Sequence, residues 1–485
     1  MADAAIKMGI LLSSVSPASQ TRTFSGEEAD TQRRRGWKYR DFKIGSIRIP
    51  WYASPPIQLT IVAFVCFLGP GMFNALTGMG GSGQINHHVA NDANTALYST
   101  FAVVGFFAGT FINVLGIKVA LFLGTFGYSV YMAAFLCYSY TQNSKFTVFA
   151  GALLGFCAAL LWTAEGTILM SYPPEKSKGK YISGLWVIFN LGAVIGSLIP
   201  LGQNIYIQEN KTITNGTYIG FLALTILGWL MYHSDKESLL ADRSIGYIRT
   251  LRMEPYIFFL FPMFFASTWS YTYVFNDVNA VRFNTRTRAL NNTLYYIMEM
   301  IGALVFGYTL DRPWIGRSTR ARIVWLALMA LNMAIWGGSY ALQKSYTRAG
   351  LTAKTFEMLD WKDPDYIGPM SLYMLYGFSD AAWQTSVYWT MGSLTNNGRK
   401  LANFAGFYKG IQSAGAAIVW RLDSIQTPYM SMLGSCWALY CGSLLIALPV
   451  ILFRIRDHTK PEEDLRFTGR ISQDVVPEVL LGQEA

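Results

Sequence analysis

Apolar runs of about 20 residues recur along this chain, and they constrain its fold more than any other feature. Each run has the length that an α-helix needs to cross the hydrocarbon core of a bilayer, which is about 30 Å thick. The composition agrees, because 52% of the 485 residues are hydrophobic and only 14% are charged, whereas a soluble chain carries about 25% charged residues. The sequence therefore predicts an all-α membrane protein that crosses the lipid bilayer many times.

Polar interruptions divide the apolar runs into twelve predicted spans, arranged as two sets of six. The spans lie at about 57–79, 96–117, 119–140, 146–170, 182–206, 218–233, 254–275, 290–310, 320–342, 366–391, 401–420 and 431–453. The expected organisation is a basic N-terminal tail (1–56), a first six-helix bundle (57–233), a polar linker (234–253), a second six-helix bundle (254–453) and a C-terminal tail (454–485). This duplicated 6 + 6 pattern is typical of transporters built from repeats.

The distribution of positive charge predicts the orientation of the spans. With the N-terminus in the cytoplasm, most of the 39 Lys and Arg residues fall in cytoplasmic tails and loops, as the positive-inside rule requires. An even number of spans then places both termini in the cytoplasm. The sequence leaves open which membrane of the cell holds the protein.

A short motif recurs at the same place in the two halves. After the second span the chain reads "GTFINVLGIK", and after the eighth it reads "GYTLDRPWIGR". In both copies an Asn or Asp follows a Gly by four residues, and a second Gly and a cation come next. The Gly allows a neighbouring helix to approach closely, and an acid at a helix end can cap the N-terminus of another helix or pair with a cation. The alternative is that cations merely end the helix. The expected conformational latch consists of Gly109, Asn113, Gly116, Lys118, Gly307, Asp311, Arg312, Gly316 and Arg317.

Four ionisable side chains lie inside predicted spans: Glu165, Glu299, Asp380 and Lys409. A charge near the bilayer centre costs at least about 2.5–3.5 kcal/mol, so each needs an explanation. Lys409 is expected to pair with Asp380 or Glu299, either in a pair that a proton or substrate breaks or in a fixed structural salt bridge. Glu165, which follows Trp162 by three residues on the same helix face, is either a proton carrier or a neutral acid bonded to a neighbour.

Other polar features of the spans give further candidates. Pro70, flanked by Gly69 and Gly71, predicts a kink in the first span that could expose backbone carbonyls to a ligand. Asn74 lies one turn beyond. The complete set of candidate substrate- or ion-coupling residues is Glu165, Glu299, Asp380, Lys409, Asn74, Trp162 and Gln384.

Several features of the predicted loops are less specific. His87, His88 and Asp92 lie in the first predicted non-cytoplasmic loop, where solvated side chains are favoured over a metal site. Arg421 and Asp423 are expected to form a helix-end ion pair of little energetic value. Three Asn-x-Thr sequons are candidate glycosylation sites on the non-cytoplasmic side: Asn210, Asn215 and Asn291.

The repeated motif resembles the Gly-x-x-x-Asp-Arg-x-Gly-Arg type that follows the second span in the major facilitator superfamily, although Asn113 replaces the acid of the first copy. Four longer segments are similar to the fungal form of the Unc-93-like branch: "GPGMFNALTGMGGSGQ" (69–84), "LLWTAEGTILMSYP" (160–173), "YGFSDAAWQTSVYWTMGSLTNN" (376–397) and "FYKGIQSAGAAIVW" (407–420). Relatives of that type often have Gln at the position of Glu165. The resemblance implies the major facilitator fold, with spans 1, 2, 4, 5, 7, 8, 10 and 11 lining a central cavity.

The function that follows is secondary transport of an unidentified small solute by alternating access, with H⁺ as the expected coupling ion. The alternative is a regulator or trafficking chaperone of other membrane proteins or ion channels, since some animal relatives resemble such proteins; the loop 343–364 and both tails would then be its contact surfaces. The sequence has no Walker loop, HExxH motif or nucleophile elbow, so ATP-driven transport and catalysis are not expected. No cofactor, metal or nucleic-acid partner is expected either.

Overall fold

The computed structural model describes residues 42–44, 47–49, 54–84, 87–173, 177–206, 212–231, 254–352 and 358–457. Two short antiparallel strands, β1 (Phe42–Ile44) and β2 (Ile47–Ile49), precede the helices. They belong to a unit that ends at Gln58, and the chain from Leu59 onward forms a second compact unit. The second unit contains nearly all of the helical structure.

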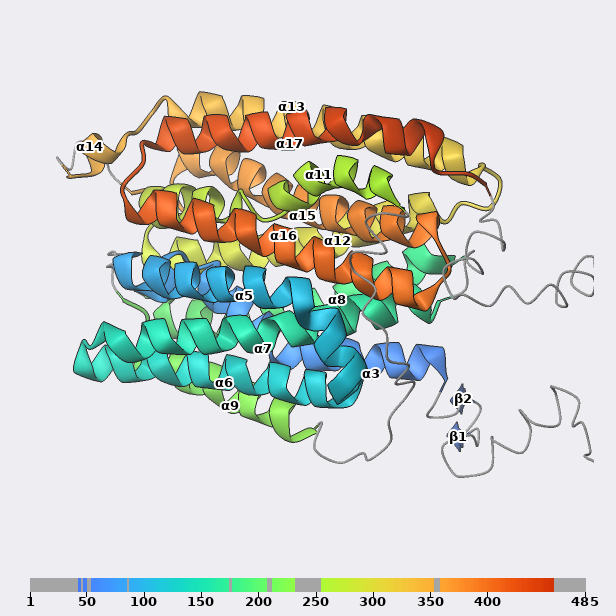
Figure 1. Cartoon of the computed structure of the whole chain (residues 1–485). Helices are drawn as coiled ribbons and strands as arrows, with labels where there is room; N and C mark the ends of the chain where they lie inside the picture. Colours follow the sequence, from blue (N-terminus) through green and yellow to red (C-terminus); the bar gives the residue numbers. More distant parts are fainter. Residues whose placement is uncertain are drawn as a thin grey trace, which may run out of the picture. The chain divides into compact units, whose positions relative to one another are not determined.

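The helices follow the predicted order of spans in both halves (Figure 1). The first half contains α3 (Pro55–Leu68), α4 (Pro70–Thr77), η2 (Gly81–Gly83), α5 (His87–Leu115), α6 (Ile117–Thr141), α7 (Ser144–Ser171), α8 (Lys178–Asn204) and α9 (Asn215–Met231). The second half contains η4 (Pro255–Leu260), α11 (Phe261–Ala266), η5 (Tyr273–Ala280), α12 (Thr285–Leu310), α13 (Arg317–Gln343), α14 (Arg348–Thr352), η6 (Pro364–Tyr366), α15 (Ile367–Leu394), α16 (Gly398–Ser424) and α17 (Tyr429–Phe453).

Length and hydropathy identify eight membrane-crossing segments within the described residues, with α3 and α4 counted as one. The helices α15 and α16 also have sufficient length, 28 and 27 residues, but they are more polar. Their polar side chains lie among the buried residues of the protein. The lower hydropathy of α15 and α16 therefore comes from polar side chains that face the interior of the protein.

The first and seventh spans, which occupy equivalent places in the two halves, are both discontinuous. In the first, α3 ends at Leu68 and α4 begins at Pro70, because proline has no N–H to continue the helical ladder. In the seventh, η4 and α11 are followed by a turn and by the π-helical segment η5. The break at Pro70 agrees with the kink predicted from the sequence, whereas the seventh span was wrongly expected to be a single helix.

Glycines allow the two halves to approach each other closely. A Cβ atom on Gly105 of α5 would lie 3.0 Å from the Cα atom of Gly410 of α16. A Cβ atom on Gly307 of α12 would lie 2.5 Å from Ser183 Oγ and 2.7 Å from the carbonyl oxygen of Gly179, both on α8. Backbone-to-backbone packing of this kind requires small residues at the contact.

The second span begins earlier than predicted. Helix α5 starts at His87 rather than near residue 96, so His87, His88 and Asp92 lie on the helix and not in a loop. The Asp92 carboxylate accepts a hydrogen bond from the Ser424 hydroxyl at 3.0 Å. We call this end of the helices, which also carries Arg348, the loop end, and we call the opposite end, which carries Gly116, Lys178 and Asp311, the tail end.

Candidate functional site

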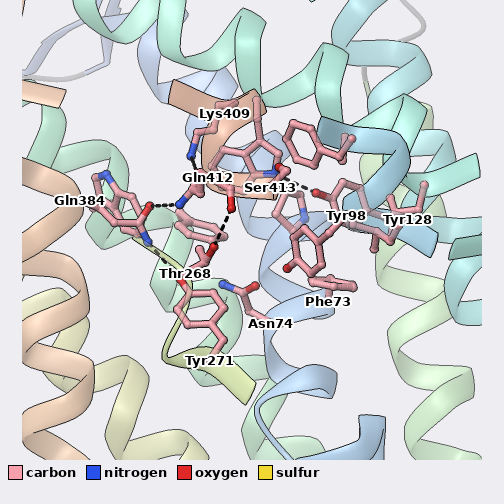
Figure 2. Close-up of a pocket in the computed structure, with 18 residues that line it drawn as sticks. Phe73, Asn74, Tyr98, Tyr128, Thr268, Tyr271, Gln384, Lys409, Gln412 and Ser413 are labelled. Carbon is pink, nitrogen blue, oxygen red and sulfur yellow. Dashed lines mark hydrogen bonds between the residues drawn. The ribbon is translucent and has the colours of Figure 1, made fainter. Parts of the chain in front are cut away.

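A cavity lies where the two halves meet (Figure 2). Of the seven candidate coupling residues, Asn74, Trp162, Gln384 and Lys409 line it, and Glu165, Glu299 and Asp380 lie behind the lining. The complete lining is Pro70, Phe73, Asn74, Leu97, Tyr98, Phe101, Tyr128, Leu154, Ala158, Trp162, Trp186, Phe189, Thr268, Tyr271, Gln384, Lys409, Gln412 and Ser413. Residues at the break in each discontinuous span also line the cavity: Pro70 in the first span, and Thr268 and Tyr271 in the seventh.

The spans that line the cavity differ from the expected set in two places. The eighth span, α12, contributes none of the lining residues, and the third span, α6, contributes Tyr128. Tyr128 is brought to the cavity because its hydroxyl accepts a hydrogen bond from Trp162 Nε1–H at 3.0 Å. Glu299 of α12 lies behind the second-half lining and does not itself line the cavity.

The cavity has two chemically different walls. The first-half wall is mainly apolar and aromatic and includes Phe73, Phe101, Trp162, Trp186 and Phe189. The second-half wall is polar throughout: Thr268, Tyr271, Gln384, Lys409, Gln412 and Ser413. An occupant therefore meets apolar surface on one side and hydrogen-bonding groups with a positive charge on the other.

Lys409 is almost completely buried, with 4% of its surface exposed. Its ammonium group donates to Gln412 Oε1 at 3.0 Å. It lies 4.6 Å from the ring centroid of Trp162, 4.7 Å from that of Tyr408 and 5.3 Å from that of Tyr388. Aromatic faces stabilise a cation through their quadrupole. No carboxylate of the described residues is paired directly with Lys409, so the direct ion pair predicted with Asp380 or Glu299 is wrong.

Two glutamines instead connect Lys409 to Asp380. Gln412 Nε2 donates to Gln384 Oε1 at 3.4 Å, and Gln384 Nε2 donates to Asp380 Oδ1 at 3.0 Å. The result is a continuous hydrogen-bonded chain, Lys409–Gln412–Gln384–Asp380, which we call the amide relay. An amide offers both a donor and an acceptor, so it can join a cation to an anion at a distance where they form no ion pair.

The acidic end of the relay is a pair of buried carboxyl groups. Asp380 Oδ2 accepts from the hydroxyl of Tyr271 at 2.8 Å and from that of Tyr295 at 3.2 Å. The carboxyl group of Glu299 interacts with that of Asp380, and its Oε2 atom has no hydrogen-bond partner among the described residues. Two carboxylates cannot hydrogen-bond each other unless one of them carries a proton. Asp380 and Glu299 thus form a site that can hold a shared proton.

Glu165 is fully buried and joins the two halves. Its Oε2 atom accepts a hydrogen bond at 2.9 Å from the hydroxyl of Tyr388, which lies on α15 of the other half. In the described part of the chain, its Oε1 atom has no hydrogen-bond partner. Trp162 turns to the cavity and Glu165 does not, so their spacing of three residues does not bring them to a common surface.

At the tail end, Asp311 caps the N-terminus of α8. Asp311 Oδ1 accepts from the N–H of Gly179 at 3.0 Å, and Oδ2 accepts from the N–H of Lys180 at 2.7 Å. The first backbone N–H groups of a helix have no partner within the helix, and its dipole favours an anion there. Lys178 adds a bond to the carbonyl of Gly392 on α15 at 2.6 Å. We call these contacts the tail-end clamp.

The other latch residues of the second half make different contacts. The Arg312 guanidinium lies over the rings of Tyr308 and Trp314, at 5.8 and 5.2 Å. Gly316 precedes α13, and Arg317 Nε donates to the carbonyl of Arg456. In this copy Asp311 hydrogen-bonds to the first half, and Gly307 packs closely against it.

The first copy of the motif forms the turn between α5 and α6. Gly116 adopts φ = +81°, a left-handed conformation that favours glycine. Gly109 lies on α5, and Lys118, half-buried, lies in the first turn of α6. The side chain of Asn113 is outside the described residues.

At the loop end, Asp423 of α16 lies in a buried network that the sequence did not reveal. Asp423 Oδ1 forms an ion pair with Arg348, which also reaches Asp277 Oδ1 at 3.1 Å. Asp423 Oδ2 accepts from Asn91 Nδ2 and from Asn276 Nδ2, both at 2.8 Å. Asn91 lies on α5 and the other members lie in the second half, so the network joins the halves. We call these five residues the loop-end clamp.

Two expectations about these residues are corrected by the clamp. Asp423 is buried, with 2% of its surface exposed, and pairs with Arg348 at the start of α14, whereas a helix-end ion pair with Arg421 was expected from the sequence. The partner could not be foreseen because 75 residues separate Arg348 from Asp423. The only indication in the sequence was that Asp423 is a charged residue near the end of α16, which is an unusually polar helix.

Further bonds at the loop end connect the first broken span to α12. Arg288 Nε donates to the carbonyl of Met79 at 2.8 Å, and Arg288 Nη2 also reaches the carbonyl of Gly80 at 2.9 Å. Asn292 Nδ2 donates to the carbonyl of Ala75 at 2.8 Å. Side chains of the second half therefore bond to the backbone carbonyls of Ala75, Met79 and Gly80, which lie near the end of α4 or just after it.

The sequons have different environments. Asn291 is fully buried in α12, where it donates to Asn279 Oδ1 at 3.1 Å and accepts from the Tyr366 hydroxyl at 2.6 Å. Its amide is therefore inaccessible, and the expected glycosylation there is wrong for the folded protein. Asn215 is half-buried at the start of α9, and Asn210 lies outside the described residues.

Comparison with known proteins gives the family. Residues 81–233 match the model of the family described as ion channel regulatory protein UNC-93. The chain is 45% identical to the UNC93-like protein C922.05c of Schizosaccharomyces pombe, over 88% of each chain. It is 39% identical to UNC93-like protein 1 of Arabidopsis thaliana, over 84% of this chain and 92% of that one.

A solved structure confirms the fold. The crystal structure of the fucose:proton symporter FucP from E. coli aligns with 83% of this chain and 99% of its own, with a TM-score of 0.56 and 14% sequence identity. At that identity the likeness concerns the fold alone, a twelve-helix major facilitator fold in two six-helix bundles. The two UNC93-like relatives show that the chain belongs to the UNC93-like family.

Proposed function

We propose that this protein is a secondary transporter that moves a small solute by alternating access, with proton coupling at Asp380 and Glu299. The observation that carries the proposal is the amide relay, which connects a cavity between the two halves to a carboxyl pair able to share a proton. A solute that contacts Gln384 or Lys409 disturbs the same hydrogen bonds that hold Asp380. Solute binding and proton binding are then linked, as coupled transport requires.

The two clamps supply the conformational part of the proposal. Each joins the first half to the second at one end of the helices, through Asp311 at the tail end and through Asp423 at the loop end. In alternating access the cavity opens at one end while the other end stays closed. We propose that release of one clamp at a time produces the two open states, with the tail end and both termini in the cytoplasm and residues 234–253 linking the bundles.

Transport measurements with reconstituted protein test the coupling. Solutes that raise the thermal stability of the purified protein are added to proteoliposomes that contain a pH-sensitive dye. In the parent protein we expect a solute gradient to drive proton movement. Asp380→Asn and Glu299→Gln should abolish proton movement, and Asp365→Asn, a change at an exposed loop carboxylate, should not. Unaltered proton movement in both site variants would remove the coupling proposal.

A second function is supported by the description of the family, ion channel regulatory protein UNC-93. A regulator would keep the fold and bind another membrane protein, and the loop 343–364 was its expected contact surface. Two charged residues of that loop are engaged within the chain, Arg348 in the loop-end clamp and Asp360 in a pair with Arg286, while Lys344, Thr347 and Lys362 are exposed. This engagement favours the transporter. Recovery of a stoichiometric membrane-protein partner, with no solute flux by the purified protein, would reverse the preference.

A further inference from the structure

We propose that the cavity binds an organic anion with an apolar, ring-containing body and one carboxylate, which pairs with Lys409. The inference deepens the proposed function, because it names the solute class for the same cavity. It is carried by the division of the cavity into an aromatic first-half wall and a polar second-half wall with a buried cation.

Among the described residues Lys409 has no direct counter-ion, because Glu165 and Asp380 interact with its charge only from beyond ion-pair distance. None of the carboxylates in the described ranges lies within ion-pair distance of its ammonium group. Glu165 is held on the hydroxyl of Tyr388, and Asp380 is reached through the two glutamines. A buried ammonium that has a single oxygen acceptor and an aromatic cage retains a strong preference for an anion. A carboxylate that enters the cavity would supply it.

Further donors in the cavity are available to the same ligand group. Among the hydrogen bonds of the described residues, none uses the side chains of Asn74, Tyr98 or Ser413, which all line the cavity and are labelled in Figure 2. Hydroxyl and amide groups can donate to a carboxylate, which offers about four acceptor positions. Lys409 supplies charge, and these three side chains supply the hydrogen bonds that orient the head group.

The glutamines favour an anion over a neutral polyol. Gln412 uses its carbonyl for Lys409 and its amide for Gln384, and Gln384 donates to both Asp380 and Tyr271. Their polar atoms are thus engaged within the protein, so few remain to bind the many hydroxyls of a sugar. The opposite wall offers rings of Phe73, Trp162 and Phe189 to an apolar body.

Matched probes of equal shape and different charge test the proposal in the purified full-length protein in nanodiscs. Three acids are used, phenylacetate, 3-phenylpropionate and naphthalene-2-carboxylate, each beside its amide and its amine. We expect at least one acid to raise the thermal stability more than its amide and amine. Lys409→Met should weaken binding of that acid by roughly tenfold or more, because it removes one partner of a buried charge pair. Lys145→Met, at the exposed start of α7, should leave binding unchanged.

Three results would overturn the proposal. The acids could stabilise the protein no better than the amides and amines, or their advantage could persist in Lys409→Met. The third result is stabilisation by neutral sugars alone that Lys409→Met leaves unchanged, which would indicate that the ligand is a polyol and not an anion. The binding test requires no flux, so an acid that binds at Lys409 but is never transported contradicts the transporter and leaves the anion site standing. Proton-coupled flux of another solute, with no acid binding, contradicts only the anion site.

Discussion

At the scale of single residues, the buried acid Glu165 differs in its contacts from Asp380 and Glu299. It lies outside the amide relay and bonds to Tyr388 across the interface between the halves. A neutral amide of the same shape can accept the same hydrogen bond from the Tyr388 hydroxyl. Glu165 therefore fits a structural acceptor, whereas Asp380 and Glu299 fit a proton site.

Substitution of Glu165 separates these roles. We expect Glu165→Gln to change the free energy of unfolding by less than about 0.5 kcal/mol, and Glu165→Leu to lower it by about 1–3 kcal/mol, because the leucine leaves a buried hydroxyl without its partner. Chemical unfolding in detergent measures both. Loss of proton coupling in Glu165→Gln, with stability retained, would instead assign the coupling proton to Glu165.

Gly307 gives a second prediction at this scale. A methyl group there would meet Ser183 Oγ at 2.5 Å and the Gly179 carbonyl at 2.7 Å, so Gly307→Ala should cost about 1–3 kcal/mol of stability through overpacking. Gly337→Ala is the control, since its Cβ would meet no atom within 4 Å on the same kind of helix; it should be neutral or stabilising. Ser183→Ala combined with Gly307→Ala should recover part of the loss. Equal thermal stabilities of the two single variants would contradict the close packing of α12 on α8.

At the scale of elements, the loop-end clamp is the contact most directly suited to control access to the cavity. Arg348 contacts two buried carboxyl groups, those of Asp277 on η5 and Asp423 on α16, and supplies the cation of the clamp. When a buried ion pair loses one partner, the remaining charge is uncompensated and the packed arrangement is strongly destabilised. Arg348→Met should therefore favour separation of the two halves at this end.

The rate at which a water-soluble maleimide labels Ser413→Cys, in the cavity lining, measures that separation. We expect labelling to be faster when Arg348→Met is added, by an order of magnitude or more, because about 3–5 kcal/mol is typical for a broken buried pair. Arg421→Met, which changes an exposed cation on the same helix as Asp423, should not alter the rate. Unchanged labelling in Arg348→Met would show that the clamp does not limit access.

The elements also show how far the sequence determines the fold and the site. Twelve spans in two halves followed from apolar runs and loop charge, because a bilayer imposes that length on every helix. The sequence singled out Asn74, Trp162, Gln384 and Lys409, which line the cavity, but their part in substrate or ion coupling stays a prediction. The pairing of Lys409 was wrong because bridging by Gln412 depends on how α15 and α16 pack. The loop-end clamp was missed because Asn91, Arg348 and Asp423 are far apart in the chain.

At the scale of the whole molecule, clamps at both ends of the helices imply a cycle in which they open separately. The tail-end clamp depends on Asp311 and the loop-end clamp on Arg348, and the cavity lies between them. If the halves move as rigid bodies, separation at one end leaves the other end closed. The tail-end clamp is thus expected to stabilise the state that is closed at the tail end, and the loop-end clamp the state that is closed at the loop end.

Spin labels on exposed residues measure this equilibrium as distance distributions. A loop-end pair is placed at Ser144 and Lys362, and a tail-end pair at Val114 and Thr319. Arg348→Met should lengthen the loop-end distance alone, and Asp311→Ala, which removes the cap of α8, should lengthen the tail-end distance alone. Simultaneous lengthening at both ends in either variant would argue for loss of the fold and against alternating access.

The close contact between Gly105 and Gly410 has a mechanical consequence for any such motion. Because the backbones of α5 and α16 touch there with no side chain between them, the two helices cannot come closer at this point, but they can rotate about it. The two halves would then rotate about this contact, and the displacement at each clamp would increase with its distance from the contact. A bulkier residue at either glycine would push α5 and α16 apart at this contact and hinder rotation about it.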